Sequence, residues 1–332
     1  MNFADREKLK RLEKTLSLNY RLTEMYAQYL ERYPEIIKAE MIKELTRDGD
    51  ISEKEALVAL LSELFALDDS RGGDDRRLIR EYLNESVTLL DAKKYENNPY
   101  YKKFPKNGIK DGAWEIRWEY YPPYRAAISG DMTLKADLTE IPPLGFFKDG
   151  FYFPAVLEGG NEWMTLTPVD VDTVEEAIFD ARGRVITFGL GLGYYAFMVS
   201  EKADVESVTV VEKSEVVIEL FKKHLLPRFD HPEKVRIINA DAFEYARDIM
   251  PSENYDYAFV DTWRDASDGL PMYEMMKKYE PLSPTCRFSY WIEGFILSRK
   301  RSLKYAEMLE KLDTGAHDAP KTYDEAVKFI TE

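Results

Sequence analysis

The sequence predicts an α/β protein with a mostly parallel sheet and helices on both faces, preceded by a helical N-terminal domain and a β-rich connector. From residue 184 on, short apolar strands alternate with helical segments, which is typical of a parallel sheet buried on both faces. Before it, residues 1–97 repeat apolar positions at helical spacing, and residues 113–167 contain runs of strand character. At 332 residues the chain exceeds the usual size of one domain, so we expect two domains or one domain with a substantial extension. The changes of pattern divide it into three parts, 1–97, 98–180 and 181–332.

The composition limits the classes of partner. A net charge of −15 disfavours nucleic acid, because phosphate binding draws on clustered lysine and arginine. The charged amino terminus has no apolar segment of signal-peptide length, and no run of about 18 apolar residues follows. The single cysteine, Cys286, can neither form an internal disulfide nor pair with another cysteine at a zinc site. We therefore expect a cytoplasmic protein without a membrane partner and without a metal.

The first 97 residues predict three or four helices. The apolar residues Ile79, Tyr82, Leu83, Val87 and Leu90 recur at the spacing of one buried helical face. Ser52 and Glu55 have the spacing of a capping box before an apolar run, which marks a helix start. The tract 97–112 contains two prolines and two glycines and is the predicted domain boundary.

The connector predicts strands and then one helix. Residues 113–121 alternate apolar and polar side chains, the pattern of a half-buried strand. Residues 151–167 predict a hairpin that turns at Gly159, Gly160 and Asn161. The segment 170–183 predicts a helix, with Asp172 and Glu175 as its cap and Gly183 past its end.

The last part predicts the repeating strand and helix pattern. Strands are expected at 184–189, 207–212, 235–240, 255–261 and, less regularly, 285–295; helices are expected at 194–203, 214–226, 241–249, 298–312 and 320–330. The carboxyl ends of parallel strands form the edge at which open α/β sheets bind ligands. Residues that follow these strands are therefore the candidates for a site.

A glycine-rich turn follows the first of these strands. Gly189, Gly191 and Gly193 alternate there, and Tyr194 stands where a dinucleotide fingerprint has its third glycine. Glycine permits a tight turn and close approach of the backbone to a ligand at a helix amino terminus. A phosphate-binding P-loop is excluded, because no lysine followed by serine or threonine comes after the glycines.

Three acids end the following strands. Glu212 lies 19 residues beyond Gly193, where an acid can accept hydrogen bonds from both ribose hydroxyls. Asp241 ends the third strand and Asp261 the fourth. Each acid alone is also compatible with a helix cap, and a nicotinamide enzyme would use the same ribose acid. The coincidence of all three with the glycine turn favours a nucleoside-containing cofactor.

The run from Val185 to Trp263, about a quarter of the chain, resembles the Rossmann-like cofactor domain of class I S-adenosylmethionine-dependent methyltransferases. The resemblance implies that GLGLG lies beside the methionine part of the cofactor and that Glu212 is the ribose acid. It also implies that Asp241 with Ala242 meets the adenine. The segments DAFEYA and YAFVD are similar to the spermidine synthase branch, whose members transfer aminopropyl from decarboxylated S-adenosylmethionine.

Two departures from this family affect the prediction. Many methyltransferases carry an acid two residues before the first glycine, and this chain has Thr187 there, so another residue must contact the cofactor's amino group. The antiparallel hairpin that closes the family's sheet is not evident after residue 295. Strands from 113–167 could complete the edge, or the sheet could end earlier.

Two acids and several aromatic residues are the candidates for catalysis and for the walls of the site. Asp261, at the end of the fourth predicted strand, and Glu293, in the segment SYWIEGF of the fifth, are the best placed for a general base. Trp263, Tyr194, Tyr273 and Trp291 could wall the site, with core packing as the alternative. The three histidines are expected to have structural or surface roles.

The sequence thus predicts an S-adenosylmethionine-dependent methyltransferase that acts on a small molecule or a protein side chain and forms S-adenosylhomocysteine; a homodimer is compatible with it. An aminopropyltransferase is the nearest alternative. A non-catalytic cofactor-binding module on the same fold is another. A nicotinamide dehydrogenase is disfavoured by the missing third glycine and by the lack of a motif for hydride chemistry downstream of the fourth strand.

Overall fold

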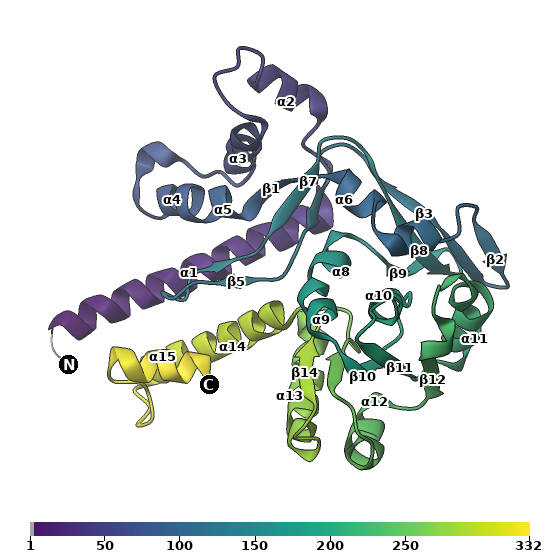
Figure 1. Cartoon of the computed structure of the whole chain (residues 1–332). Helices are drawn as coiled ribbons and strands as arrows, with labels where there is room; N and C mark the ends of the chain where they lie inside the picture. The colour runs from purple at the N-terminus through teal and green to yellow at the C-terminus, as the bar shows by residue number, and fades with distance from the viewer. Residues whose placement is uncertain (1–2) are drawn as a thin grey trace. The chain divides into compact units, whose positions relative to one another are not determined.

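The computed structural model describes residues 3–332 and divides the chain into two compact units. The first unit contains the residues up to Leu90, then Pro122–Lys148, and the chain from Gly294 onward. The second unit contains Asp91–Tyr121 and Asp149–Glu293. Figure 1 shows the course of the chain through both.

The first unit is mostly helical. Its longer elements are α1 (Phe3–Arg32), α2 (Ala39–Leu45), α3 (Glu53–Leu64), α4 (Gly73–Arg77), α5 (Asn84–Ser86), β1 (Val87–Leu90), β4 (Ala126–Ile128), β5 (Thr133–Leu134), β6 (Glu140–Ile141), β7 (Leu144–Phe147), α14 (Glu293–Thr314) and α15 (Tyr323–Thr331). A short 3₁₀ turn covers Asp69–Arg71, and a π-helical turn covers Leu78–Leu83. The capping box predicted at Ser52 and Glu55 is confirmed at the start of α3.

The second unit carries the larger sheets. Its elements are α6 (Ala92–Glu96), α7 (Pro99–Lys103), β2 (Ile109–Asp111), β3 (Trp114–Tyr121), β8 (Phe151–Glu158), β9 (Asn161–Thr165), α8 (Pro168–Asp172), α9 (Glu175–Asp180), β10 (Gly183–Phe188), α10 (Tyr194–Ser200), β11 (Val205–Glu212), α11 (Glu215–His224), β12 (Val235–Asn239), α12 (Ala242–Glu244), β13 (Tyr257–Val260), α13 (Ala266–Tyr279) and β14 (Arg287–Tyr290). A π-helical turn at Tyr245–Ile249 and 3₁₀ turns at Leu226–Arg228, Pro232–Lys234, Met250–Ser252 and Glu280–Leu282 complete it.

The predicted parallel sheet is confirmed. Its strand order is β12-β11-β10-β13-β14, and every neighbouring pair is parallel. This is the 3-2-1-4-5 order of a Rossmann-type sheet, in which the order reverses between the first and fourth strands. The central strand pairs on both sides; Phe188, for example, lies opposite Val211 of β11 and Val260 of β13. The point of reversal therefore lies directly after β10, at the glycine turn.

The edge of this sheet ends at β14. The strands of the connector do not extend it, because β2, β3, β8 and β9 form an antiparallel sheet of their own. Its β8–β9 hairpin turns at Gly159 and Gly160, with φ of +59° and +85°, as the sequence predicts. Of the two expectations for the edge, the structure therefore has the shorter sheet.

The helical prediction for residues 87–90 is wrong, because this segment is strand β1. It pairs in parallel with β7, and Val87 lies opposite Leu144. Val87 is fully buried, and the β-branched Val87 and Thr88 suit a strand. The partner strand is more than 50 residues away in sequence, so local spacing does not reveal it.

The helix predicted over 170–183 begins earlier than expected and is interrupted. Its capping box is Thr167 with Asp170 at the start of α8, not Asp172 with Glu175. Asp172 instead accepts hydrogen bonds from Lys94 and Tyr95. The interruption between α8 and α9 falls at Thr173 and Val174, two β-branched residues.

The C-terminal helices belong to the first unit rather than to the unit that holds the parallel sheet. Leu12 and Leu16 of α1 form one buried cluster with Met308 of α14 and Ile330 of α15. Figure 1 shows these three helices side by side. The units therefore differ from the predicted parts 1–97, 98–180 and 181–332, because apolar contacts between the two ends of the chain bring those ends together.

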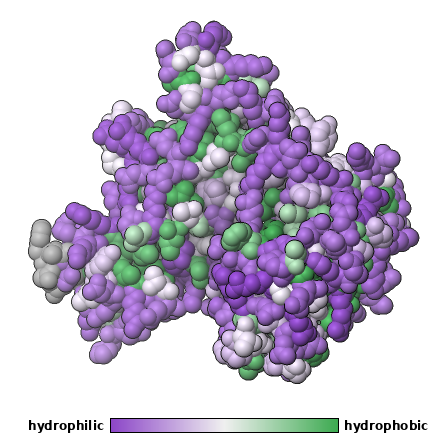
Figure 2. Space-filling model, viewed as in Figure 1, coloured by the Kyte–Doolittle hydropathy of each residue, from purple (hydrophilic) through white to green (hydrophobic). Residues whose placement is uncertain are grey.

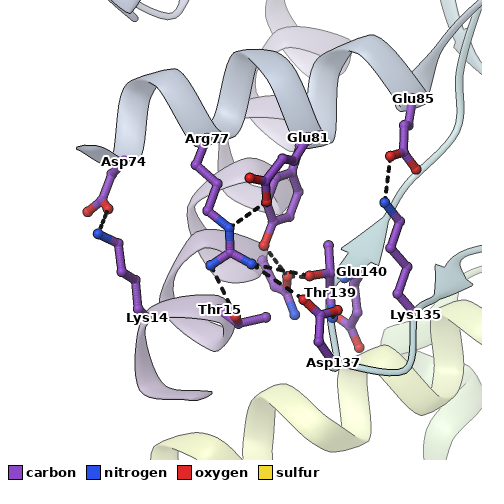
Figure 3. A network of polar contacts seen from close by, with 12 residues as sticks. Lys14, Thr15, Asp74, Arg77, Glu81, Glu85, Lys135, Asp137, Thr139 and Glu140 are labelled. Atoms are coloured by element: carbon purple, nitrogen blue, oxygen red, sulfur yellow. Dashed lines mark hydrogen bonds and ion pairs between the residues drawn. The ribbon is translucent and has the colours of Figure 1, made fainter. Parts of the chain in front are cut away.

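Polar contacts tie residues 122–148 to the helices of the first unit (Figure 3). Arg77 donates to Thr15 of α1 at 3.1 Å, to Glu81 at 2.8 Å and to Thr139 at 3.4 Å. Glu140, which is 4% exposed, pairs with Arg301 of α14. A buried carboxylate needs such a partner, so this pair fixes the position of the segment on α14.

Hydrophilic residues predominate on the face of the molecule seen in Figure 2, in keeping with a composition that is 32% charged. Within residues 3–332, the structure contains no helix whose length and apolar character would let it cross a membrane.

Candidate functional site

The turn between β10 and α10 requires glycine at its first position. Gly189 has a φ of +99°, which L side chains rarely adopt. A Cβ atom there would lie 1.9 Å from the carbonyl oxygen of Asp261. The Gly189 N–H donates to the carbonyl of Val211 at 2.9 Å. The backbone at this residue is thus fitted closely between the ends of β11 and β13.

Glycine is present for different reasons at the other two positions of the turn, Gly193 and Gly191. Gly193 caps α10 with a φ of +78°, and a Cβ atom there would lie 2.2 Å from the ring of Phe221. This glycine lets α10 pack against α11. Gly191 has a φ of +50°, and its Cβ atom would meet only the terminal methyl of Met164, at 3.1 Å. The middle glycine therefore borders a space that is open except for the flexible end of Met164.

That space is a cavity of about 320 Å³ at the carboxyl ends of the parallel strands. Residues from the glycine turn, from the ends of β11, β12 and β13, and from β9 line it. Most of the predicted cofactor residues are among them: Gly189, Gly191, Glu212, Asp241, Ala242, Asp261 and Trp263. Of the remaining two, Gly193 supports helix packing, and Tyr194 lines a neighbouring recess. The volume lies in the range of small-molecule sites.

The neighbouring recess is much smaller, with a volume of about 30 Å³. It adjoins the large cavity, since Met164, Gly189, Leu190, Gly191 and Asp261 line both. Two of its lining residues are carboxylates, Asp170 and Asp261, and none is a lysine, arginine or histidine. The recess is therefore an acidic extension of the cavity with room for one or two water-sized groups.

Glu212 lies at the end of β11 and anchors the glycine turn. Its Oε2 accepts a hydrogen bond from the Leu190 N–H at 3.1 Å, and its Oε1 accepts one from the Ser214 N–H at 2.7 Å. Each carboxylate oxygen can accept a further bond. The side chain is thus held at the wall of the cavity with acceptor capacity that a ribose hydroxyl could use.

Asp241 is a helix cap as well as a wall of the cavity. Its Oδ1 accepts from the N–H groups of Phe243 and Glu244, and its Oδ2 lies 3.1 Å from the Lys213 ammonium. Partial burial raises the pKa of Asp241, but the Glu244 N–H and Lys213 lower it more, so its pKa lies below the ordinary value. Ala242 follows it with only 9% exposure. The carboxylate is therefore charged, and its outer oxygen retains capacity for a ligand.

Asp261 lies where the two cavities meet. No described residue donates a hydrogen bond to the Asp261 carboxylate. The backbone N–H of Asp261 donates to the carbonyl oxygen of Phe188. Burial and the negative charges of Asp170 and Glu212 raise the pKa of the Asp261 carboxyl from 3.8 to about 8. A carboxyl in a cleft with such a pKa is suited to exchange protons near neutral pH.

Sequence reasoning missed Asp170. Thr167 donates to its Oδ2 from both the backbone N–H (2.7 Å) and the hydroxyl (2.8 Å). Burial raises the pKa of Asp170 to about 6, although the bonds from Thr167 lower it. The available signal was the threonine-proline start of α8 with an acid three residues after the threonine, which is the spacing of a capping box. That signal gives the helix start but not the neighbouring recess.

Two residues of the β8–β9 hairpin were also missed. Trp163 and Met164 line the large cavity, and Met164 reaches the middle glycine of the turn. Trp163 packs edge-on against Trp114 of β3, with 5.5 Å between the ring centroids. The antiparallel sheet therefore supplies an apolar wall, which no pattern in the sequence of β9 indicates.

The predicted aromatic residues fall into two groups. Trp263 lines the large cavity and Tyr194 and Trp291 line the recess, and all three are buried. Tyr273 lines neither cavity, and its hydroxyl donates to Glu293 at 2.6 Å. Glu293 likewise lines neither cavity, so the structure does not bring this candidate base to the site.

No family model matches the sequence, and no curated protein matches it. Among solved structures, the chain is similar to spermidine synthase from Thermotoga maritima, with 18% identity over 59% of this chain and 62% of that enzyme, at a TM-score of 0.32. A spermidine synthase in complex with the transition state analogue AdoDATO is 18% identical over 59% of this chain and 61% of that protein, at a TM-score of 0.32. A protein described as a caffeoyl-CoA O-methyltransferase from Staphylococcus aureus is 17% identical over 45% of this chain and 64% of that protein, at a TM-score of 0.25. The matches span about three fifths of each of these proteins. None of them shows a family for this chain.

Proposed function

We propose that the chain is a transferase that uses S-adenosylmethionine and methylates a small molecule or a protein side chain. The observation that carries the proposal is the convergence of the glycine turn, Glu212, Asp241 with Ala242, and Asp261 on one cavity of about 320 Å³. These residues come from the ends of successive parallel strands, at the reversal of strand order where such sheets bind ligands.

The residues present fit an adenosyl ligand. Glu212 would accept hydrogen bonds from the ribose hydroxyls, and the outer oxygen of Asp241 would accept one from the adenine amine. Gly191 leaves room beside the turn, where a Cβ atom would approach Met164. Trp163, Met164 and Trp263 provide the apolar and aromatic surface that a purine and a sulfonium require.

The reaction needs positioning and one proton acceptor. The ligand supplies a methyl group on positively charged sulfur, and the electron pair of the broken carbon–sulfur bond stays on sulfur as the neutral thioether forms. The walls of the cavity would align the acceptor's nucleophile with that bond and exclude water. Asp261, whose carboxylate accepts no bond from a described residue, would take the proton that the nucleophile loses.

Aminopropyl transfer from decarboxylated S-adenosylmethionine is a second candidate. The charge of the small recess favours it, because two carboxylates line this recess and no cationic side chain does. A donor side chain that ends in an ammonium alone suits such surroundings, whereas the extra carboxylate of S-adenosylmethionine would meet like charge there.

Calorimetric titration of the purified protein tests the proposal and separates the candidates. The ligands are S-adenosylmethionine, S-adenosylhomocysteine, decarboxylated S-adenosylmethionine and NAD. We expect micromolar binding of the first two. A preference for the decarboxylated ligand would move the assignment to aminopropyl transfer. Binding of NAD alone, or of none of the four, would contradict an adenosyl-sulfonium transferase.

Replacing Glu212 by alanine is expected to weaken S-adenosylhomocysteine binding by about 1–3 kcal/mol, because the ribose hydroxyls lose a charged acceptor and the Leu190 N–H loses its partner. Calorimetry measures the change, and circular dichroism checks the fold. Glu206→Ala is the matched control, since Glu206 is exposed on the same strand. Unchanged affinity in folded Glu212→Ala protein would refute the ribose assignment.

A further inference from the structure

The small recess beside the glycine turn has an unbalanced charge. Asp170 lines it from α8 and Asp261 lines it from the end of β13. None of the other lining residues is an acid, a lysine, an arginine or a histidine. Glu212, in the adjoining cavity, adds a third carboxyl group near Asp261. The cations of that cavity, Lys213 and Arg264, do not line the recess. The recess therefore lacks a positive group of its own.

The two carboxylates also have unused acceptor capacity. Thr167 donates twice to Asp170, and both bonds end on Oδ2, which leaves Oδ1 as an acceptor. The Asp261 carboxylate receives no hydrogen bond from any described residue. Both carboxyls have raised pKa values, about 6 and about 8, because they are buried near like charge without a cation. These properties all fit a site that is completed by a cationic ligand group.

The volume and position of the recess limit which cationic group of a ligand could bind there. About 30 Å³ holds a group the size of an ammonium, not a guanidinium or a quaternary amine. The recess adjoins the glycine turn, and Thr187 lines it at the position where an acid was expected by resemblance. The Thr187 hydroxyl instead lies 3.4 Å from the carbonyl of Gly189. If the donor's ammonium binds here, an acid from another element must take the place of the missing acid at position 187.

We propose that Asp170 binds the ammonium group at the end of the donor's side chain, with Asp261 across the same recess, in place of an acid at position 187. This inference rests on the proposed function, since it assigns one contact of the same adenosyl-sulfonium ligand. The positive charge of the bound ammonium lowers the pKa of Asp261, so this carboxyl loses its proton and becomes available as a base when the donor is bound. Asp170 is thus a donor-binding residue that is supplied by α8, outside the strand ends.

The test compares ligands with and without the ammonium. S-Adenosylhomocysteine and S-adenosyl-3-thiopropylamine carry the ammonium, whereas 5′-methylthioadenosine has the same adenosine and a neutral thioether sulfur but lacks the ammonium. In Asp170→Asn we expect calorimetric affinity for the first two to fall about 10- to 100-fold and affinity for methylthioadenosine to change less than about twofold. Asparagine keeps an acceptor for Thr167, so the cap of α8 is retained.

Asp172→Asn is the matched control, because Asp172 lies on the same helix but pairs with Lys94 and Tyr95. It should leave the affinity for all three ligands unchanged. An equal loss for methylthioadenosine in Asp170→Asn, or no loss for the ammonium-bearing ligands, would overturn the inference while leaving the proposed function standing. If the wild-type protein bound none of the three, the proposed function would fail as well.

A measurement on the wild-type protein avoids any folding defect. At pH 7 Asp261, with its pKa of about 8, is largely protonated, and a neighbouring ammonium lowers that pKa. Binding of S-adenosyl-3-thiopropylamine, whose sulfur is a neutral thioether, should therefore release close to one proton, measured from heats in buffers of different ionisation enthalpy. Methylthioadenosine should release less than half as much. Equal release by the two ligands would contradict an ammonium in the recess.

Discussion

Replacing Gly189 by alanine is expected to prevent the second unit from folding normally. The added Cβ atom would lie 1.9 Å from the Asp261 carbonyl, and backbone on both sides holds that position. The φ of +99° adds strain for any L side chain. We expect a loss of at least about 4 kcal/mol in the free energy of unfolding, or insoluble protein. Chemical denaturation and circular dichroism of the purified variant measure the loss.

Gly191→Ala is expected to impair ligand binding at the turn more than it impairs folding. Gly191 has a φ of +50°, and its Cβ atom would meet only the flexible end of Met164. The cost to stability should be about 1–2 kcal/mol, while affinity for S-adenosylhomocysteine falls because the methyl enters the ligand cavity. A Gly189→Ala protein that is as stable as Gly191→Ala would contradict the close fit between the turn and β13.

Replacing Asp261 by asparagine is expected to stabilise the protein at alkaline pH and to abolish transfer. The folded protein raises the pKa of this carboxyl from 3.8 to about 8, so the folded state binds its proton more tightly than the unfolded state does. The contribution of Asp261 to stability is therefore present below pH about 4 and is lost as the pH rises through about 8. At pH 9 the wild-type protein keeps a charge in unfavourable surroundings that asparagine lacks.

The gain in Asp261→Asn should reach roughly 3 kcal/mol at pH 9 and vanish near pH 4, since each pKa unit corresponds to about 1.4 kcal/mol and solvent in the cavity reduces the full effect. Urea unfolding at the two pH values measures it. Asp111→Asn is the control, because Lys223 and His224 lower the pKa of the Asp111 carboxyl, and it should show no gain at pH 9. A loss of stability in Asp261→Asn at pH 9 would show that the charge is favourable in the fold.

The structure gives the three acids unequal roles, although each ends a parallel strand. Asp241 caps a helix and faces Lys213, so its charge is stabilised without a ligand. Glu212 holds the glycine turn through the Leu190 N–H. Asp261 receives no such bond. Of the three acids, Asp261 therefore has the fewest partners within the protein and the most capacity for a ligand or a proton.

Much of the candidate site could be predicted because its signals are local. The glycines at 189, 191 and 193 all have positive φ, a backbone conformation that glycine adopts without strain. Glu212 and Asp261 follow apolar runs that are buried strands, and parallel strands bring their carboxyl ends to one edge.

Other features depend on residues that are far apart in the chain. Thr88 lies in a strand because it pairs with Gly145, and α15 packs on α1 because Ile330 and Leu12 share one apolar cluster. The exposure of Asp170 to the recess depends likewise on Thr187 and Asp261, which belong to other elements.

The sequence by itself thus determined the parallel sheet, the glycine turn and the acids at its edge, because backbone conformation and periodicity act between near neighbours. Only the tertiary structure decided the partition into units, the apolar wall from β9 and the acidic recess. Hydrophobic burial is non-directional, so the pattern of apolar residues shows that a segment is buried but not against which partner.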